Sequence, residues 1–133
     1  MKKPETIFKE KVLSDLKALP HTYFVKIQQK TQRGIPDIFI CCRGAFIAIE
    51  LKKSEKESPD DLQDYNLFKI NEAQGMALTA DPTNWKDTFS KLSKFACYQV
   101  VSPEWRELEA IRYRPDLSSY QKEDSTHHAR KSR

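Results

Sequence analysis

Two apolar segments joined by one very short connection are the feature that most constrains the fold of this chain. Residues 38–42 and 45–52 are dominated by β-branched, aromatic and other apolar residues, and only Arg43 and Gly44 separate them. Such residues favour strands, and a two-residue connection favours a tight turn between strands. We therefore predict a hairpin, in which the start of the first strand lies beside the end of the second.

Charged residues stand at that end of the predicted hairpin. Asp37 opens the first strand, and Glu50 and Lys52 stand near the end of the second. Because side chains alternate faces along a strand, Glu50 and Lys52 share one face. The other face carries apolar side chains, which we expect to pack on a helix: Ile47, Ile49 and Leu51. Two carboxylates and a lysine at one point are what a hard cation and a phosphate ester require.

The surrounding sequence resembles a known nuclease family. Gly34-Ile35-Pro36-Asp37 followed by Glu50-Leu51-Lys52 is similar to the motif of the VRR-NUC branch of the PD-(D/E)xK nuclease superfamily. Leu62-Gln63 resembles the helix glutamine of that branch, and Ala73-Gln74-Gly75 leads toward a further strand. Asp…Glu-x-Lys alone arises often by chance. The three features together make the resemblance specific, and it covers about residues 4 to 81.

The resemblance implies a restriction-endonuclease-like α/β core, with a mixed central sheet flanked by helices. The hydrophobic patterns agree with that order of elements. We expect helices at residues 4–19, 60–74 and 82–96, and strands at 22–28, 38–42, 45–52 and 76–80. Residues 98–101 fit an edge strand, and the pattern of residues 105–113 is ambiguous. We place the nuclease domain at residues 1–116 and a polar, basic, disordered tail at residues 117–133.

The resemblance also assigns chemical roles. Asp37 and Glu50, with the backbone carbonyl of Leu51, are expected to hold Mg²⁺ or Mn²⁺, because oxygen-only ligands favour these ions over zinc. Lys52 is expected to position the attacking water and stabilise the transition state. Gln63 is expected to orient the phosphate or that water, with Tyr65 and Asn66 as weaker candidates.

Each of these residues also has a simpler interpretation. Asp37 follows Pro36 and fits a turn. Glu50 fits a charge that protects an edge strand from aggregation. Gln63 fits a solvated position on a helix.

An acidic residue on the first helix is a further expectation from the family, and both Glu5 and Glu10 qualify by type. Glu5 precedes Phe8 by three residues and Val12 by seven, so it shares the apolar face turned toward the sheet, whereas Glu10 lies roughly opposite. We therefore choose Glu5 as a further catalytic and metal-binding residue. The alternative is an ordinary acid that favours the helix dipole.

Charge and cysteine content add little. The net charge is +4, which suits a nucleic-acid-binding protein and many others. Candidates for contacts with a phosphate backbone are Lys26, Lys30, Arg33 and Lys53, although basic residues often only solvate a surface. The three cysteines form neither a disulfide framework nor a zinc-binding spacing. We expect them to be small buried residues in a reducing compartment.

Together these observations predict a Mg²⁺- or Mn²⁺-dependent DNA endonuclease. The resemblance suggests a stand-alone, phage-type enzyme that cuts branched or Holliday-junction DNA. A symmetric dimer would suit a junction, and Trp85, Trp105 and Tyr113 could supply part of its interface, with core packing as the simpler use. Because no apolar run has the length of a membrane span or signal peptide, we expect a cytoplasmic protein of a bacterial or phage-infected cell. Two alternatives stay open: a non-catalytic DNA-binding or interaction module with the same fold, and an RNA-directed or defence-related nuclease.

Overall fold

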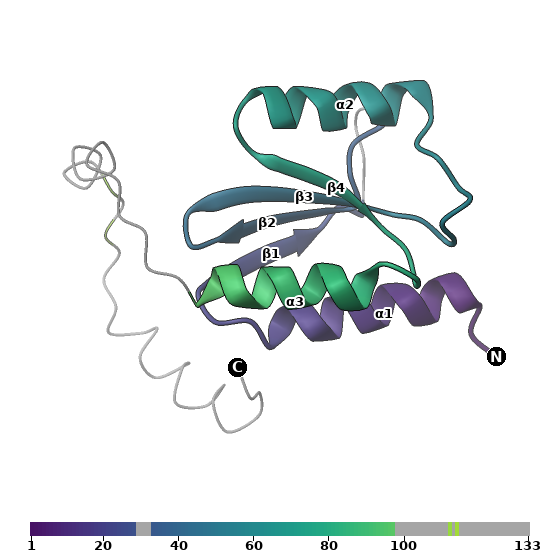
Figure 1. The fold of residues 1–133 in the computed structure, drawn as a ribbon, viewed down its shortest axis with the longest axis horizontal. Coiled ribbons are helices and arrows are strands. Elements are labelled where there is room, and N and C mark those ends of the chain that lie inside the picture. The colour runs from purple at the N-terminus through teal and green to yellow at the C-terminus, as the bar shows by residue number, and fades with distance from the viewer. Residues whose placement is uncertain (29–32, 98–111, 113, 115–133) are drawn as a thin grey trace. The chain divides into compact units, whose positions relative to one another are not determined.

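A four-stranded mixed sheet organises the described part of the chain (Figure 1). A computed structural model describes residues 1–28, 33–97, 112 and 114, and the chain divides into two units, Met1–Tyr98 and Gln99–Arg133. In the first unit the strands are β1 (Thr22–Lys26), β2 (Ile38–Cys42), β3 (Ala45–Leu51) and β4 (Met76–Ala80), in that spatial order. The β1–β2 and β2–β3 pairs are antiparallel and β3–β4 is parallel. The predicted mixed sheet and its hairpin are confirmed.

Helices cover both faces of this sheet. Helices α1 (Pro4–Lys17) and α3 (Trp85–Ala96) lie along one face, and α2 (Asp61–Glu72) lies on the other (Figure 1). Alternation along the strands sends one set of apolar side chains toward α1 and α3. The resulting core joins α1, the strands and α3, and its largest fully buried members are Val12, Leu16, Ile38, Ile40, Cys42 and Ile49. The predicted α/β layering is confirmed.

Most predicted element boundaries lie within about two residues of the observed ones, which is the usual uncertainty of helix ends. α1 begins at Pro4, where the fixed φ of proline suits the first turn, and it ends at Lys17, before Pro20. The larger error is at α3, which begins at Trp85 and not at residue 82. Residues 81–84 instead form a turn, because the Asp81 carboxylate binds the backbone that would otherwise enter the helix.

The Asp81 turn is a dense set of hydrogen bonds beneath α3. Its Oδ1 accepts from the backbone N–H groups of Thr83 at 2.8 Å and Asn84 at 3.0 Å, and from the Thr83 hydroxyl. In return, Asn84 Oδ1 accepts from the Asp81 N–H at 2.9 Å. The Thr83 hydroxyl bond is the largest cause that lowers the pKa of Asp81 below its ordinary 3.8, with the two backbone bonds adding to it and burial opposing it.

This turn predicts a pH dependence of stability. A carboxyl whose pKa is lower in the folded state stabilises the fold above its unfolded pKa, and this contribution is lost as the pH falls through the folded pKa. Asp81→Asn should therefore lower the free energy of unfolding by about 1 kcal/mol at pH 7. It should also flatten the decline in stability below pH 3.8. Urea unfolding at several pH values measures both, and an unchanged acid decline in the variant would contradict the assignment.

The burial of Trp85 and of the cysteines tests two predictions. Trp85 is buried, its indole N–H donates to Asp15 Oδ2 at 2.8 Å, and its ring lies 5.7 Å from that of Phe89, so core packing is its use. The prediction that the cysteines are buried is correct for Cys42 and wrong for Cys41 and Cys97. Cys41 and Cys42 are neighbours on β2 and must face opposite sides of the sheet.

Several predictions concern residues outside the described ranges. They are the edge strand at 98–101, residues 105–113 apart from Arg112, the tail at 117–133, and the side chains of Lys30, Trp105 and Tyr113. In the part of the chain that the structure does describe, no helix is long and apolar enough to cross a membrane.

Candidate active site

The β2–β3 hairpin places Asp37 and Glu50 opposite each other. Its turn is Arg43-Gly44, with φ values of 55° and 85°, as a two-residue hairpin turn requires. Ile38 pairs with Ile49, so continuing the register by one residue sets Asp37 against Glu50. The Leu51 N–H donates to Asp37 Oδ2 at 2.8 Å, which fixes the Asp37 carboxylate beside β3.

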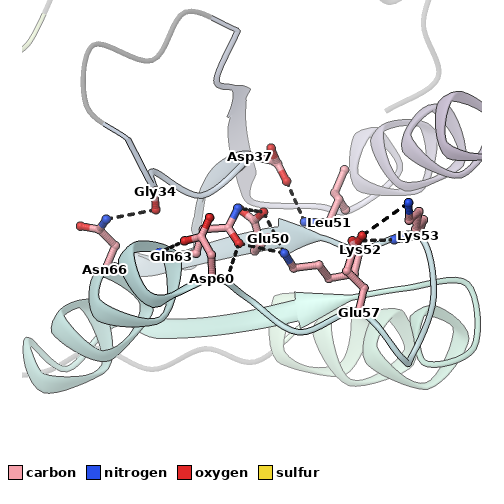
Figure 2. A network of polar contacts seen from close by, with 10 residues as sticks. All are labelled: Gly34, Asp37, Glu50, Leu51, Lys52, Lys53, Glu57, Asp60, Gln63 and Asn66. Carbon is pink, nitrogen blue, oxygen red and sulfur yellow. Dashed lines mark hydrogen bonds and ion pairs between the residues drawn. The ribbon is translucent and has the colours of Figure 1, made fainter.

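Glu50, Lys52 and Gln63 form a buried polar network on the face of the sheet that carries α2 (Figure 2). Glu50 is 4% exposed and Lys52 is 7% exposed. Lys52 Nζ lies 3.6 Å from Glu50 Oε2 and donates to Gln63 Oε1 at 2.9 Å. Gln63 Nε2 donates to Glu50 Oε2 at 2.8 Å. One amide therefore holds both charged side chains.

Gln63 is itself fixed by the start of α2. Asp60 is the N-cap of this helix, and its side chain accepts from the Gln63 N–H at 2.8 Å. The Asp60 N–H donates to Gln63 Oε1 at 3.0 Å, which completes a capping box. Gln63 Oε1 thus accepts from both Asp60 and Lys52, so its amide is held in the orientation that turns Nε2 toward Glu50 (Figure 2).

A second contact joins α2 to the loop that carries Asp37. Gly34 has a φ of 79°, in the left-handed region, and its carbonyl accepts from Asn66 Nδ2 at 3.1 Å (Figure 2). A Cβ atom on Gly34 would lie 2.8 Å from the backbone C and O atoms of Leu62. α2 therefore positions Glu50 and Lys52 through Gln63, and the loop before Asp37 through Asn66.

A polar pocket of about 270 Å³ opens beside these residues. It is lined by residues of α1, of the hairpin end and of the loop after β3: Glu5, Thr6, Phe8, Lys9, Asp37, Leu51, Lys52, Lys53 and Glu57. Glu5 is exposed and lies in the wall of this pocket. Among the described residues, no three His, Cys, Asp or Glu side chains converge closely enough to hold one metal ion. Glu5 thus shares the pocket with Asp37 without forming such a cluster.

The oxygen donors at the hairpin end fit a hard divalent cation. Asp37 and Glu50 contribute carboxylates from opposed positions on two paired strands. In a strand, the N–H and C=O of one residue project to the same side. The Leu51 N–H donates to Asp37, so the Leu51 carbonyl also projects toward Asp37. Three oxygen groups and no thiolate or imidazole match Mg²⁺ or Mn²⁺ better than zinc.

The predicted phosphate-contacting residues lie in different places. Lys53 is exposed, its Nζ lies 3.9 Å from Glu57 Oε2, and it lines the pocket. Arg33 is exposed beside Gly34, and its carbonyl lies 3.4 Å from Asn66 Nδ2. Lys26 is half-buried and pairs with Ile38, so alternation places it on the face opposite Glu50.

Sequence reasoning missed two polar residues at this site. Asp60 had a visible signal, because Asp followed three residues later by Gln is the pattern of a capping box. Lys9 also had one, because it lies four residues after Glu5 and therefore on the same face of α1.

Comparisons with known proteins add no assignment. No family model, curated protein or solved structure matches this chain.

Proposed function

We propose that this chain is a metal-dependent nuclease of the PD-(D/E)xK type, similar to the VRR-NUC branch. One observation carries the proposal. Asp37 and Glu50 face each other across the hairpin, and the buried Lys52 ammonium lies 3.6 Å from Glu50. Burying a carboxylate and an ammonium is costly, and hydrophobic residues of similar volume often serve stability equally well. A buried charged group beside a polar pocket therefore favours a chemical role over a structural one.

The side chains have separate tasks in this proposal. Asp37, Glu50 and the Leu51 carbonyl would hold Mg²⁺ or Mn²⁺, which supplies an activated water and offsets phosphate charge when bound. Lys52 places a positive charge where negative charge grows on the phosphate, and it does so from a position already fixed by Gln63. Gln63 orients Lys52 and Glu50 together, and Glu5 stands at the pocket wall as a further acid.

The substrate part of the proposal rests on the resemblance. Branched or Holliday-junction DNA is the proposed substrate, and a homodimer with two sites is the simplest assembly for two symmetric cuts. The chain is proposed to act inside a bacterial or phage-infected cell. An RNA substrate would use the same residues, so the test below includes RNA.

A second candidate is a non-catalytic nucleic-acid-binding module with the same fold. It is favoured by the mutual contacts of Glu50, Lys52 and Gln63, because a buried structural ion pair would also be hydrogen-bonded in this way.

Cleavage assays separate these candidates. Linear, flap and four-way-junction DNA and a matched RNA are incubated with Mg²⁺, Mn²⁺, Ca²⁺ or EDTA. We expect cutting in Mg²⁺ or Mn²⁺, binding with little cutting in Ca²⁺, and no cutting in EDTA. Glu50→Gln, which keeps the side-chain shape, should lose cutting under every condition. Robust cleavage in EDTA would contradict the metal mechanism, and binding without any cleavage would favour the second candidate.

A further inference from the structure

Lys9 is a lysine of α1 that sequence reasoning did not connect with the site. It stands in the second turn of the helix and is half-buried, whereas Lys11 and Lys17 of the same helix are exposed. Its side chain lines the pocket that also contains Asp37, Leu51 and Lys52. Lys9 therefore lies at the candidate active site, on a different element from the hairpin.

The partners of the neighbouring lysines distinguish Lys9. Lys2 lies 3.0 Å from Glu10 and Lys11 lies 3.0 Å from Asp15. Within residues 1–28 and 33–97, the Lys9 ammonium forms no ion pair, since no carboxylate oxygen lies within 4.0 Å of it. Lys52 is drawn inward by Gln63 and Glu50. Among the described residues that line the pocket, the ammonium groups left for a ligand are those of Lys9 and of Lys53, whose contact with Glu57 is long at 3.9 Å.

These two lysines line the same pocket from different elements. Lys9 comes from α1, and Lys53 comes from the loop after β3. In Figure 2 the Lys53–Glu57 pair lies on the side of the site where the purple helix, α1, passes. Because Asp37 lines the same pocket, a nucleic acid with one phosphate beside Asp37 would bring its neighbouring phosphate toward these two ammonium groups.

The charge of the pocket adds a condition. Its lining contains three lysines and three carboxylates, so its formal charges balance: Lys9, Lys52 and Lys53 against Glu5, Asp37 and Glu57. A balanced pocket has little attraction for a polyanion. A divalent cation held by Asp37 and Glu50 would make the charge of the pocket net positive, which favours a phosphate beside Lys9 and Lys53.

We propose that Lys9 and Lys53 form a phosphate subsite that binds the phosphodiester next to the scissile one, and that it does so only when a divalent cation is bound. This inference rests on the proposed function and deepens it. The ligand is a phosphodiester of a nucleic acid, whether DNA or RNA. Lys9 acts on binding, and the chemistry stays with Asp37, Glu50 and Lys52.

The test compares Lys9→Gln with Lys17→Gln, which removes the same charge from an exposed position at the other end of α1. Binding of short DNA and RNA oligonucleotides is measured in Ca²⁺ and in EDTA over a series of salt concentrations. In Ca²⁺, Lys9→Gln should weaken binding and reduce the slope of log K against log salt by about 0.9 for duplex or about 0.7 for single strands. Lys17→Gln should keep the wild-type slope.

Three further readouts make the outcome decisive. In EDTA the two variants should bind alike, and in Mg²⁺ Lys9→Gln should raise KM while leaving kcat nearly unchanged. Lys9→Arg should restore the slope, because it restores the charge. A Lys9→Gln slope equal to that of Lys17→Gln in Ca²⁺ would overturn the subsite while leaving the nuclease proposal intact. A wild-type protein that neither binds nor cuts any of the nucleic acids would instead overturn the proposed function.

Discussion

The Lys52→Met variant is expected to remain folded and to lose about 10²- to 10³-fold in kcat on whichever nucleic acid the wild-type protein cuts. Methionine keeps the unbranched shape and most of the length of the side chain, and it removes the charge that would face the phosphate. Because that charge acts mainly on the transition state, KM should change much less than kcat. Single-turnover cleavage in Mg²⁺ measures the effect.

The folding of this variant needs its own measurement. Removing one partner of a buried ion pair can cost about 3 to 5 kcal/mol, and Lys52 and Glu50 are 7% and 4% exposed. Thermal unfolding therefore accompanies the assay. Lys52→Gln provides a second variant, because its amide can still donate to Gln63 Oε1.

Lys53→Met is the matched control for this experiment. It removes a neighbouring charge that is exposed and contacts Glu57 instead of Glu50 and Gln63. It should alter salt-dependent binding and leave kcat near the wild-type value. Folded Lys52→Met and Lys52→Gln proteins that cut at the wild-type rate would remove Lys52 from the chemistry.

Local patterns were sufficient to predict the hairpin and the side of the sheet on which its charges lie. The two-residue connection fixed the pairing of β2 with β3, and alternation placed Glu50 and Lys52 away from Ile49, as observed. Helix α1 followed from the spacing of its apolar residues, of which Phe8, Val12 and Leu16 are buried. These features depend on residues close together in sequence, so their physical causes are visible in the sequence.

Contacts between distant elements were not predictable in the same way. Asn66 reaches the Gly34 carbonyl, 32 residues away, only because of the position of α2 over the sheet. The helix spacing puts Lys9 on the same face of α1 as Glu5, but which residues it meets in the pocket depends on how α1 packs against the sheet. Gln63 contacts Lys52 because the capping box fixes its amide and because α2 packs over the sheet. The family resemblance could therefore suggest a role for Gln63, but sequence spacing could not predict which residues it contacts.

The predicted start of α3 was wrong by three residues, because a local side-chain interaction competes with the helix. The predicted start was residue 82, and a proline does suit the first turn of a helix. The Asp81 carboxylate instead accepts from the N–H groups of Thr83 and Asn84, and these bonds close a turn before the helix. Side chains of this type compete with the helix for backbone donors.

Gly34→Ala is expected to cause a large loss of stability, about 2 to 5 kcal/mol. The left-handed φ of 79° costs a non-glycine residue about 1 to 2 kcal/mol. The new Cβ would also lie 2.8 Å from backbone atoms of Leu62 and 2.9 Å from Asn66 Nδ2. Backbone of a helix cannot give way as a side-chain end can, so overpacking adds about 1 to 3 kcal/mol. Urea unfolding measures the sum.

Gly44→Ala separates the two causes. Gly44 has a similar φ of 85°, and a Cβ atom there meets nothing within 4 Å, so this variant shows the backbone cost alone. The difference between the two variants is then the cost of pushing α2 away from the Gly34 loop. Because α2 carries Gln63, Gly34→Ala should also lower kcat in protein that is still folded, whereas Gly44→Ala, at the far end of the hairpin, should not. If the two variants lost equal stability and had equal kcat values, α2 would not be needed to position the Asp37 loop relative to Glu50 and Lys52.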